Sequence, residues 1–292
     1  MSPSDWYFTE DVGDLLARAT DFLHSRPDLH TVPLTVTEAL RTHGAAVYGS
    51  AAPAFGLLER AGEVRAVFFR TPPHHLVLTP LTPEDADGLA VRLAHLGHPL
   101  PGVDGDRDTA ASFAEAWQRH TGAIPTLSER KRLYRLGGLT PPEPSPAGRA
   151  RIAGEADREQ LVLWHRGFVA DVGGTSAADG ESWADTRIAA GRVTLWETPD
   201  GTPVSMAGVS PLVAGQIRIA PVYTPPHLRG RGYGGAATVA ASRAALGAGA
   251  AQVLLFTDLA NATSNALYQR IGYRPVADFA VYDFASGAPA AR

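Results

Sequence analysis

The sequence has no cysteine among its 292 residues. That absence excludes a disulfide framework, a catalytic cysteine and a thiolate metal site. Lys131 is the only lysine, and the formal net charge of −4 argues against a general nucleic-acid binder. The histidines have no metal-ligand spacing, because neighbours on a strand such as His74 and His75 point to opposite faces. We therefore expect no metal and no nucleic-acid partner.

Long apolar runs are also missing. No stretch approaches the length of a membrane span, and residues 1–6 carry neither the basic region nor the apolar core of a secretory signal. These absences predict a cytoplasmic protein with no membrane partner. With 45% hydrophobic and 19% charged residues, the chain can bury a substantial core and is long enough for two ordinary domains.

The most informative stretch is residues 222–236, in which a strand end, a glycine-rich turn and a helix start follow one another. Residues 216–223 alternate apolar with polar side chains and include β-branched and aromatic types, which predicts a strand. Glycines at a helix start leave backbone N–H groups open to an oxyanion, and the helix dipole adds positive potential there. The pattern therefore predicts a pyrophosphate cradle, with Arg229 and Arg231 able to neutralise phosphate at its flanks.

The spacing of these glycines matches neither the dinucleotide fingerprint G-x-G-x-x-G nor the phosphate loop G-x-x-x-x-G-K-[ST]. It does fit [Q/R]-x-x-G-x-[G/A], and here the sequence resembles the GNAT superfamily of acyl-CoA N-acyltransferases. The alternative is a helix that merely starts after a loop. The resemblance implies acetyl-CoA as the acyl donor, bound by Val222, Tyr223, Thr224, Arg229, Gly230, Arg231, Gly232, Tyr233, Gly234 and Gly235.

A second segment, residues 252–276, agrees with the first. A strand-like run is followed by a short expected helix, with Asn261 or Thr263 as its N-cap. The segment matches N-x-x-S-x-x-L-Y-x-x-x-G-[FY], a pattern of the superfamily. The resemblance implies that Tyr268 protonates the departing thiolate of coenzyme A. It also implies cofactor contacts for the polar side chains on this helix, namely Asn261, Ser264 and Asn265. The alternative for Tyr268 is an aromatic side chain that closes the helix on the sheet.

The resemblance further implies that the strand at residues 216–223 splays from the strand at residues 252–256. Backbone amides near Val222 and Thr224 would then bond the thioester carbonyl and the pantetheine arm. Direct attack by an amine in a ternary complex fits a chain without cysteine. Residues 169–182 form an acidic loop that would favour a cationic amine. The general base stays open among candidates that fit by residue type, each of which also fits a surface or capping role: Asp258, Glu181, Asp171, His165 and His227.

Residues 137–148 are rich in proline and glycine and predict a linker between two domains. The second domain, residues 149–285, has the expected order β-α-α-β-β-β-α-β-α-β-β, and a tail follows at residues 286–292. The first domain, residues 1–136, repeats this order in outline. We therefore expect a mixed, mostly antiparallel α/β (α+β) fold, with two GNAT-like sheets flanked by helices in tandem. An unrelated α/β domain is the alternative for the first half.

The two halves are not chemically equal. The helix start at residues 82–87 carries carboxylates that would repel a pyrophosphate, so we expect no cofactor site in the first domain. Its expected role is part of the acceptor cleft or a homodimer contact. The basic cluster at residues 130–135 is interpreted as a solvated helix face. The predicted function is N-acetylation of a primary amine on a small molecule. The alternatives are a non-catalytic acyl-CoA sensor or scaffold, and a protein or peptide amine acetyltransferase.

Overall fold

The structure, a computed structural model, describes residues 6–97, 99–173 and 180–285. By packing contacts the chain forms two units. Unit 1 draws on Met1–Leu133, Asp258–Ala260 and Val276–Arg292, and unit 2 on Tyr134–Thr257 and Asn261–Pro275. The predicted ranges, 1–136, 137–148 and 149–285, divide the chain in sequence order, whereas packing returns residues 276–285 to unit 1. The predicted tail, 286–292, lies outside the described residues.

Unit 1 is a sheet covered by helices. Its elements are β1 (Trp6–Thr9), α1 (Val12–Ser25), α2 (Thr31–His43), the 3₁₀ turn η1 (Ala45–Tyr48), β2 (Ala54–Arg60), β3 (Glu63–Arg70), β4 (Leu76–Leu78), α3 (Pro83–His95), β5 (Gly102–Asp106), α4 (Arg107–Thr121) and β6 (Ile124–Leu136), which ends in unit 2. Neighbouring strands are antiparallel from β1 to β4, and β4 and β5 are parallel.

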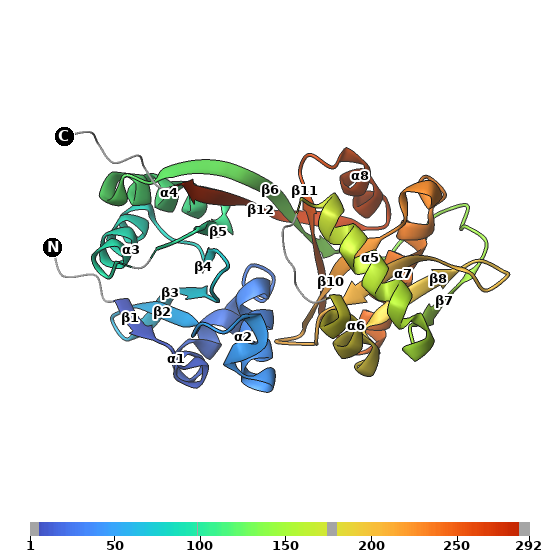
Figure 1. Ribbon diagram of the computed structural model, residues 1–292, viewed down its shortest axis with the longest axis horizontal. Coiled ribbons are helices and arrows are strands. Elements are labelled where there is room, and N and C mark those ends of the chain that lie inside the picture. The colour runs from blue at the N-terminus through green and yellow to red at the C-terminus, as the bar shows by residue number, and fades with distance from the viewer. Residues whose placement is uncertain (1–5, 98, 174–179, 286–292) are drawn as a thin grey trace. The chain divides into compact units, whose positions relative to one another are not determined.

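Local signals explain the helices of unit 1. In α1, the Asp11 side chain accepts a hydrogen bond from the Gly13 N–H, and Leu15, Ala19 and Leu23 are buried at helical spacing. Helix α3 has Thr82 as N-cap and a proline in its first turn. Helices α3 and α4, teal and green in Figure 1, pack their buried faces into one core with the strands.

Strand β12 (Tyr273–Ala285), from the far end of the sequence, lies between β5 and β6 in the strand order. It starts in unit 2, and its second half pairs antiparallel with β5 from Phe279↔Asp106 to Asp283↔Gly102. Ala280 lies in the core of unit 1, and the Phe284 ring stacks on Trp117 at 6.0 Å. Residues from the far end of the sequence therefore complete the first sheet.

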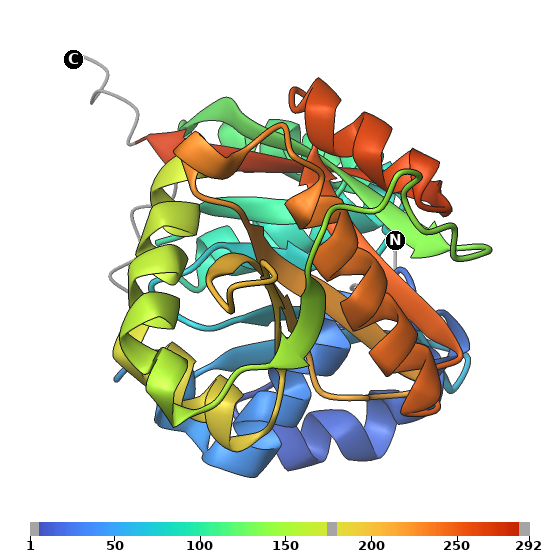
Figure 2. The same ribbon diagram turned by 90° about the vertical axis from the view of Figure 1, so that its right-hand side faces the viewer.

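Unit 2 repeats the element order of unit 1. Its elements are β7 (Arg149–Ile152), η2 (Glu155–Asp157), α5 (Arg158–Asp171), α6 (Gly180–Ala189), β8 (Val193–Glu197), β9 (Pro203–Val209), β10 (Gln216–Tyr223), η3 (Pro226–Leu228), α7 (Tyr233–Gly247), β11 (Gln252–Asp258), α8 (Ala262–Arg270) and the start of β12. Strands β7 to β10 are antiparallel, and β10 and β11 are parallel. Figure 2 shows α5 in yellow-green and α7 in orange on either side of these strands. The predicted mixed, mostly antiparallel α/β class is confirmed.

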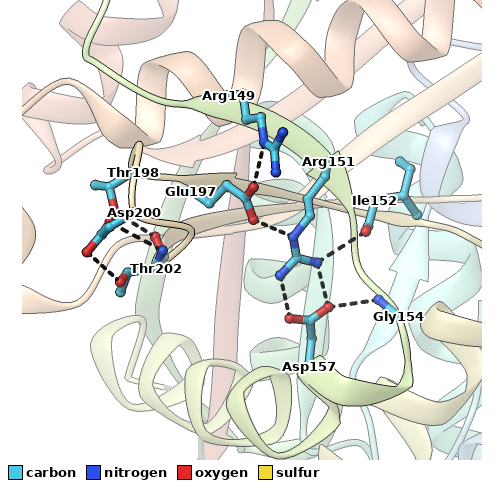
Figure 3. A network of polar contacts seen from close by, with 9 residues as sticks. All are labelled: Arg149, Arg151, Ile152, Gly154, Asp157, Glu197, Thr198, Asp200 and Thr202. Carbon is cyan, nitrogen blue, oxygen red and sulfur yellow. Dashed lines mark hydrogen bonds and ion pairs between the residues drawn. The ribbon is translucent and has the colours of Figure 1, made fainter.

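An ion-pair network fixes the first strand of unit 2 (Figure 3). The buried Glu197 carboxylate accepts hydrogen bonds from Arg149 Nε at 2.7 Å and Arg151 Nε at 2.5 Å. Arg151 also forms a bidentate pair with Asp157, and the Asp157 carboxylate accepts the Gly154 N–H at 2.8 Å. These contacts keep the pKa of Glu197 below its ordinary value, through Arg149 first and then Arg151. The network joins β7 to β8 and to the start of α5.

One sequence interpretation needs correction, and one helix of unit 1 was missed. The basic cluster does not lie on a helix, because residues 124–136 form strand β6. On that strand Arg132 pairs with Asp278 at 2.6 Å and Lys131 pairs with Asp104 at 2.6 Å. Helix α2 was not predicted from the sequence. Its threonines have low helix propensity, and Thr35 and Thr37 return their hydroxyls to carbonyls four residues earlier.

Candidate functional site

Strands β10 and β11 separate partway along their length. Their parallel pairing runs from Gln216↔Gln252 to Arg218↔Leu254 and, within the described residues, goes no further. On its other edge β10 stays paired with β9 through Tyr223↔Met206, with an irregularity between Ile219 and Val222. The final residues of β10 therefore present an edge with no strand partner toward β11. This is the opening that the resemblance implied.

Helix α7 begins beside the end of that edge. Its N-cap, Gly232, has a left-handed φ of 83° and makes no side-chain cap, and Gly230 has a φ of 77°. Glycine suits both positions because side chains rarely tolerate such φ values. The helix ladder starts with the Ala236 N–H on the Gly232 carbonyl at 3.0 Å. The first-turn N–H groups of Tyr233, Gly234 and Gly235 have no protein acceptor in the described chain.

The space around these amides is open at Gly230 and filled by neighbouring side chains at Gly234 and Gly235. A Cβ at Gly230 would meet no atom within 4 Å, whereas a Cβ at Gly234 would lie 3.2 Å from Thr224 Oγ1. A Cβ at Gly235 would lie 3.0 Å from the Leu267 side chain of α8. Helices α7 and α8 therefore meet next to the predicted cradle.

Both predicted arginines stand beside the α7 start. Arg229 donates from Nε to the Thr224 carbonyl at 2.9 Å, and its guanidinium lies 5.8 Å from the centre of the Tyr223 ring. The same guanidinium forms an ion pair with Asp171, the last residue of α5. Arg231 donates to the His227 carbonyl at 3.5 Å. The two side chains are thus held by the loop before α7 and, for Arg229, by α5.

Two residues that sequence reasoning missed support the β10 end. Ser205 on β9 is fully buried, and its hydroxyl donates to the Tyr223 carbonyl at 3.0 Å and shares a hydrogen bond with Thr224 Oγ1 at 2.9 Å. Gly167 on α5 lies against the Tyr223 hydroxyl, which would be 2.4 Å from a Cβ there. A glycine inside a predicted helix is a signal of close packing that could have identified Gly167. No sequence signal identifies Ser205.

The two asparagines at α8 form hydrogen bonds with the helix backbone and, for Asn265, with Tyr134 of β6. Asn261, not Thr263, is the N-cap, and its Oδ1 accepts the Ser264 N–H at 2.9 Å. Asn265 Oδ1 accepts from the Tyr134 hydroxyl at 2.8 Å, and its Nδ2 donates to the Asn261 carbonyl at 2.8 Å. The polar groups of both asparagines therefore shape the helix. Any contact of these side chains with a cofactor remains a prediction.

Tyr268 is a buried residue of the unit 2 core, with 7% of its surface exposed. Its ring meets Tyr273 edge-on at 6.1 Å between centroids, and the Tyr273 hydroxyl forms a hydrogen bond with Ser242 at 2.7 Å. Burial raises the pKa of Tyr268 to about 12. The phenol is therefore protonated near neutral pH, as a proton donor must be. The packing alternative for Tyr268 also describes the geometry correctly.

The candidate bases are dispersed. Asp258 belongs to unit 1, where its carboxylate accepts the Ala260 N–H at 2.8 Å. Glu181 lies 3.5 Å from Arg158 on the exposed side of α6. His227 is exposed in η3.

His165 has a different environment. It is buried on α5, where it stacks on Trp183 at 4.5 Å, and its Nδ1 has no hydrogen-bond partner among the described residues. Burial and, secondarily, Arg187 lower its pKa, so it is neutral near pH 7. Part of the predicted acceptor loop, residues 174–179, lies outside the described residues.

Among the residues that the structure describes, no group of three histidine or acidic side chains is arranged to hold a metal ion. Among the same residues, no helix combines the length and the apolar character that crossing a membrane requires.

Comparisons with known proteins agree with the geometry of unit 2. The family model described as "Acetyltransferase (GNAT) family" matches residues 164–273. No curated protein matches the chain.

Several solved structures share the fold of nearly the whole chain. The GCN5-related N-acetyltransferase from Sphaerobacter thermophilus has a TM-score of 0.63 at 16% identity, covering 99% of this chain and 98% of its own. The GNAT acetyltransferase from Colwellia psychrerythraea has a TM-score of 0.61 at 12% identity, covering 96% and 99%. A tandem GNAT protein from the clavulanic acid biosynthesis pathway has a TM-score of 0.56 at 14% identity, covering 98% and 100%.

The family match falls on the unit with the opened strand pair and the uncapped helix start, and the structural matches extend over both units. Residues 164–273 belong to the GNAT acetyltransferase family, and the chain as a whole shares its fold with solved GNAT structures, one of them a tandem GNAT protein.

Proposed function

We propose that this protein transfers an acetyl group from acetyl-CoA to a primary amine of a small molecule. One observation carries the proposal. In unit 2, the β10 edge that has no strand partner is followed, after η3, by a helix start whose first-turn N–H groups have no acceptor among the described residues. An extended amide chain that ends in a pyrophosphate has the chemistry to use both features.

The residues present fit acetyl-CoA as a substrate. The amides of Gly230 to Gly235 and the two flanking arginines would hold the pyrophosphate, and the open side of Gly230 leaves room for it. The β10 edge at Val222 to Thr224 would hold the pantetheine arm. Bound there, acetyl-CoA supplies an acetyl group activated as a thioester.

The protein's part in the reaction is electrostatic stabilisation and proton transfer. A backbone N–H on the β10 edge would donate to the oxygen on which charge develops when the amine attacks, and one such donor is commonly worth about 2.7–4 kcal/mol. Tyr268 would keep its proton until the leaving thiolate needs it. A chain without cysteine offers no thiol to carry the acetyl group. This favours direct attack of the amine on acetyl-CoA in a ternary complex.

Calorimetric titration with coenzyme A tests the cradle. The test protein is a Gly232→Asp, Gly234→Asp double variant, which adds two carboxylates at the α7 start and strains the left-handed N-cap. The control is Gly247→Asp at the other end of the same helix, where a Cβ meets no atom within 4 Å. We expect binding to be lost in the double variant and kept in the control. Unchanged affinity in the double variant would overturn the site.

Release of free thiol from acetyl-CoA over a panel of amines, amino acids, aminoglycosides and peptides tests the reaction. Turnover at roughly 1–10³ s⁻¹ on a small amine would support the proposal. Turnover confined to peptides would favour the protein-acetylating alternative. Tight binding of acetyl-CoA without turnover, together with a co-purifying partner, would favour the sensor or scaffold.

A further inference from the structure

One arginine of the predicted cradle has its charge satisfied by a neighbouring helix. Arg229 is paired with Asp171, and its Nε is used by the Thr224 carbonyl at 2.9 Å. The Tyr223 ring lies 5.8 Å from the guanidinium. The guanidinium therefore spans from the end of β10 to the end of α5. A phosphate that needs this charge must compete with the Asp171 carboxylate for it.

Asp171 lies where α5 meets the predicted acceptor loop. Asp171 ends α5, and the chain then enters the acidic loop that was predicted to border the acceptor. The carboxylate is half-exposed, with 42% of its side chain accessible, and Arg229 is similarly open at 48%. An exposed pair of this kind is weak and is readily exchanged. A diphosphate, with more than one negative charge and several acceptor oxygens, would replace a single carboxylate on a guanidinium.

We propose that Arg229 is handed from Asp171 to the pyrophosphate when acyl-CoA binds, and that the released Asp171 carboxylate then takes an ammonium group of the acceptor. This inference rests on the proposed function of the same site, and it narrows the acceptor class to amines that are positively charged at neutral pH. Asp171 acts as a positioning residue for Arg229 before the cofactor binds and as a specificity residue afterwards. Cofactor and cationic acceptor therefore bind with positive coupling.

A double-mutant cycle on coenzyme A binding tests the first step. Asp171→Asn should tighten binding by about two- to five-fold, the worth of an exposed ion pair. The same change should have no effect when Arg229→Gln is already present, because no pair is left to break. Asp171→Glu keeps the charge and should bind as the wild type does. Asp185→Asn, which breaks another exposed pair of unit 2, with Arg158, controls for loss of charge alone.

The outcomes separate the two proposals. If wild-type protein does not bind coenzyme A, the proposed function fails. If it binds but Asp171→Asn has no effect, the handover fails. If Asp171→Asn tightens binding equally with and without Arg229, the effect is general electrostatics and the handover also fails. Thermal melts of each variant identify any change that comes from lost folding.

The second step is tested by binding, so it does not depend on turnover. Coenzyme A affinity is measured with and without 1,5-diaminopentane at matched ionic strength, and again with the uncharged 1,5-pentanediol. We expect the diamine to tighten coenzyme A binding in the wild type and to lose this effect in Asp171→Asn. The diol should have no effect in either protein. A diamine effect that is absent in the wild type, or that persists in Asp171→Asn, would overturn the role of Asp171 toward the acceptor.

Discussion

The two units place the same helix after the same strand but treat its first turn differently. In unit 1, α3 starts at Thr82, whose hydroxyl accepts the Asp85 N–H at 3.2 Å, and Glu84 and Asp85 stand in the first turn. Asp85 is held in addition by Arg60 at 2.5 Å. In unit 2, α7 starts at Gly232 with no side-chain cap and no acidic residue in its first turn. The α3 start is capped by a side chain, whereas the α7 start has no side-chain cap.

The strands before these helices differ in the same sense. In unit 1 a side chain pairs with the backbone just after β4, because Thr109 Oγ1 accepts the Leu81 N–H at 2.8 Å. The Thr79 hydroxyl, also after β4, bonds to both backbone groups of Val67 on the neighbouring strand β3. In unit 2 the corresponding β10 edge faces a strand that has separated from it. The comparison teaches that two copies of one fold can differ in which backbone donors they leave unpaired, and the proposed site lies in the copy that leaves them unpaired.

The strongest test of this difference lies in the chemistry of unit 2. Tyr268→Phe removes the hydroxyl that we propose as the proton donor while keeping the ring against Tyr273. We expect kcat to fall by roughly 10²–10⁴-fold with little change in the acyl-CoA KM, because the proton is needed only in the transition state. Steady-state kinetics measure both constants.

A neighbouring tyrosine supplies the control. Tyr273→Phe removes only the hydrogen bond to Ser242, so it should lower stability by about 1 kcal/mol and leave kcat near the wild-type value. Equal kcat for Tyr268→Phe and wild type would remove Tyr268 from the mechanism.

Freeing a backbone N–H in unit 1 should not create a second coenzyme A site. Thr109→Val removes the hydroxyl that serves the Leu81 N–H, and leaving that group unpaired should cost about 1–3 kcal/mol of stability. Coenzyme A should gain no second binding site, because Glu84 and Asp85 still stand at the α3 start. Urea unfolding and titration stoichiometry are the measurements. Thr109→Ser keeps the hydroxyl and should retain stability. A second bound coenzyme A in Thr109→Val would contradict the comparison.

A smaller effect on the acid dependence of stability is expected from one buried histidine in each unit. Burial is the main cause that lowers the pKa of both His30 and His165. In the unfolded chain both histidines have the ordinary histidine pKa of about 6.5, so they bind more protons there than in the folded protein. Stability therefore falls as the pH drops through about 6.5. His30 Nδ1 bonds to the Leu23 carbonyl at 3.0 Å, whereas His165 Nδ1 has no partner among the described residues.

Phenylalanine at either position should remove part of the acid sensitivity. His30→Phe also loses the Leu23 bond and should cost about 0.5–1.5 kcal/mol at pH 7.5, while His165→Phe should be close to neutral there. Urea titrations at several pH values measure both. An unchanged acid dependence in both variants would show that other groups control it.

The sequence predicted most of what local rules control. The start of α7 was predictable because glycine spacing and the preceding alternation need no distant information. The threonine-rich helix α2 was not, since tertiary burial overrides its weak propensity. Strand β6 was taken for a helix face because its arginines and lysine find partners such as Asp278 and Asp104, which only the fold brings near.

For the candidate site, the sequence indicated which residues to consider better than it indicated the contacts that those residues make. Asn261 and Asn265 were predicted as cofactor contacts, but the hydrogen bond between Asn265 and Tyr134 depends on where β6 ends, which the sequence did not indicate. The pair of Arg229 with Asp171 joins residues far apart in the sequence, and no spacing rule predicts it. Contacts of this kind follow from packing and have no local signature.

The return of β12 to unit 1 has a consequence for how the chain is made. Strand β5 receives its antiparallel neighbour only when residues 279–283 have left the ribosome, so the first sheet stays incomplete until nearly the whole chain is synthesised. During that interval the β5 backbone is an open edge of the kind that recruits other strands. Expression of residues 1–136 alone would make that exposure permanent. The two folds lie in tandem in sequence but cannot be separated by a single cut.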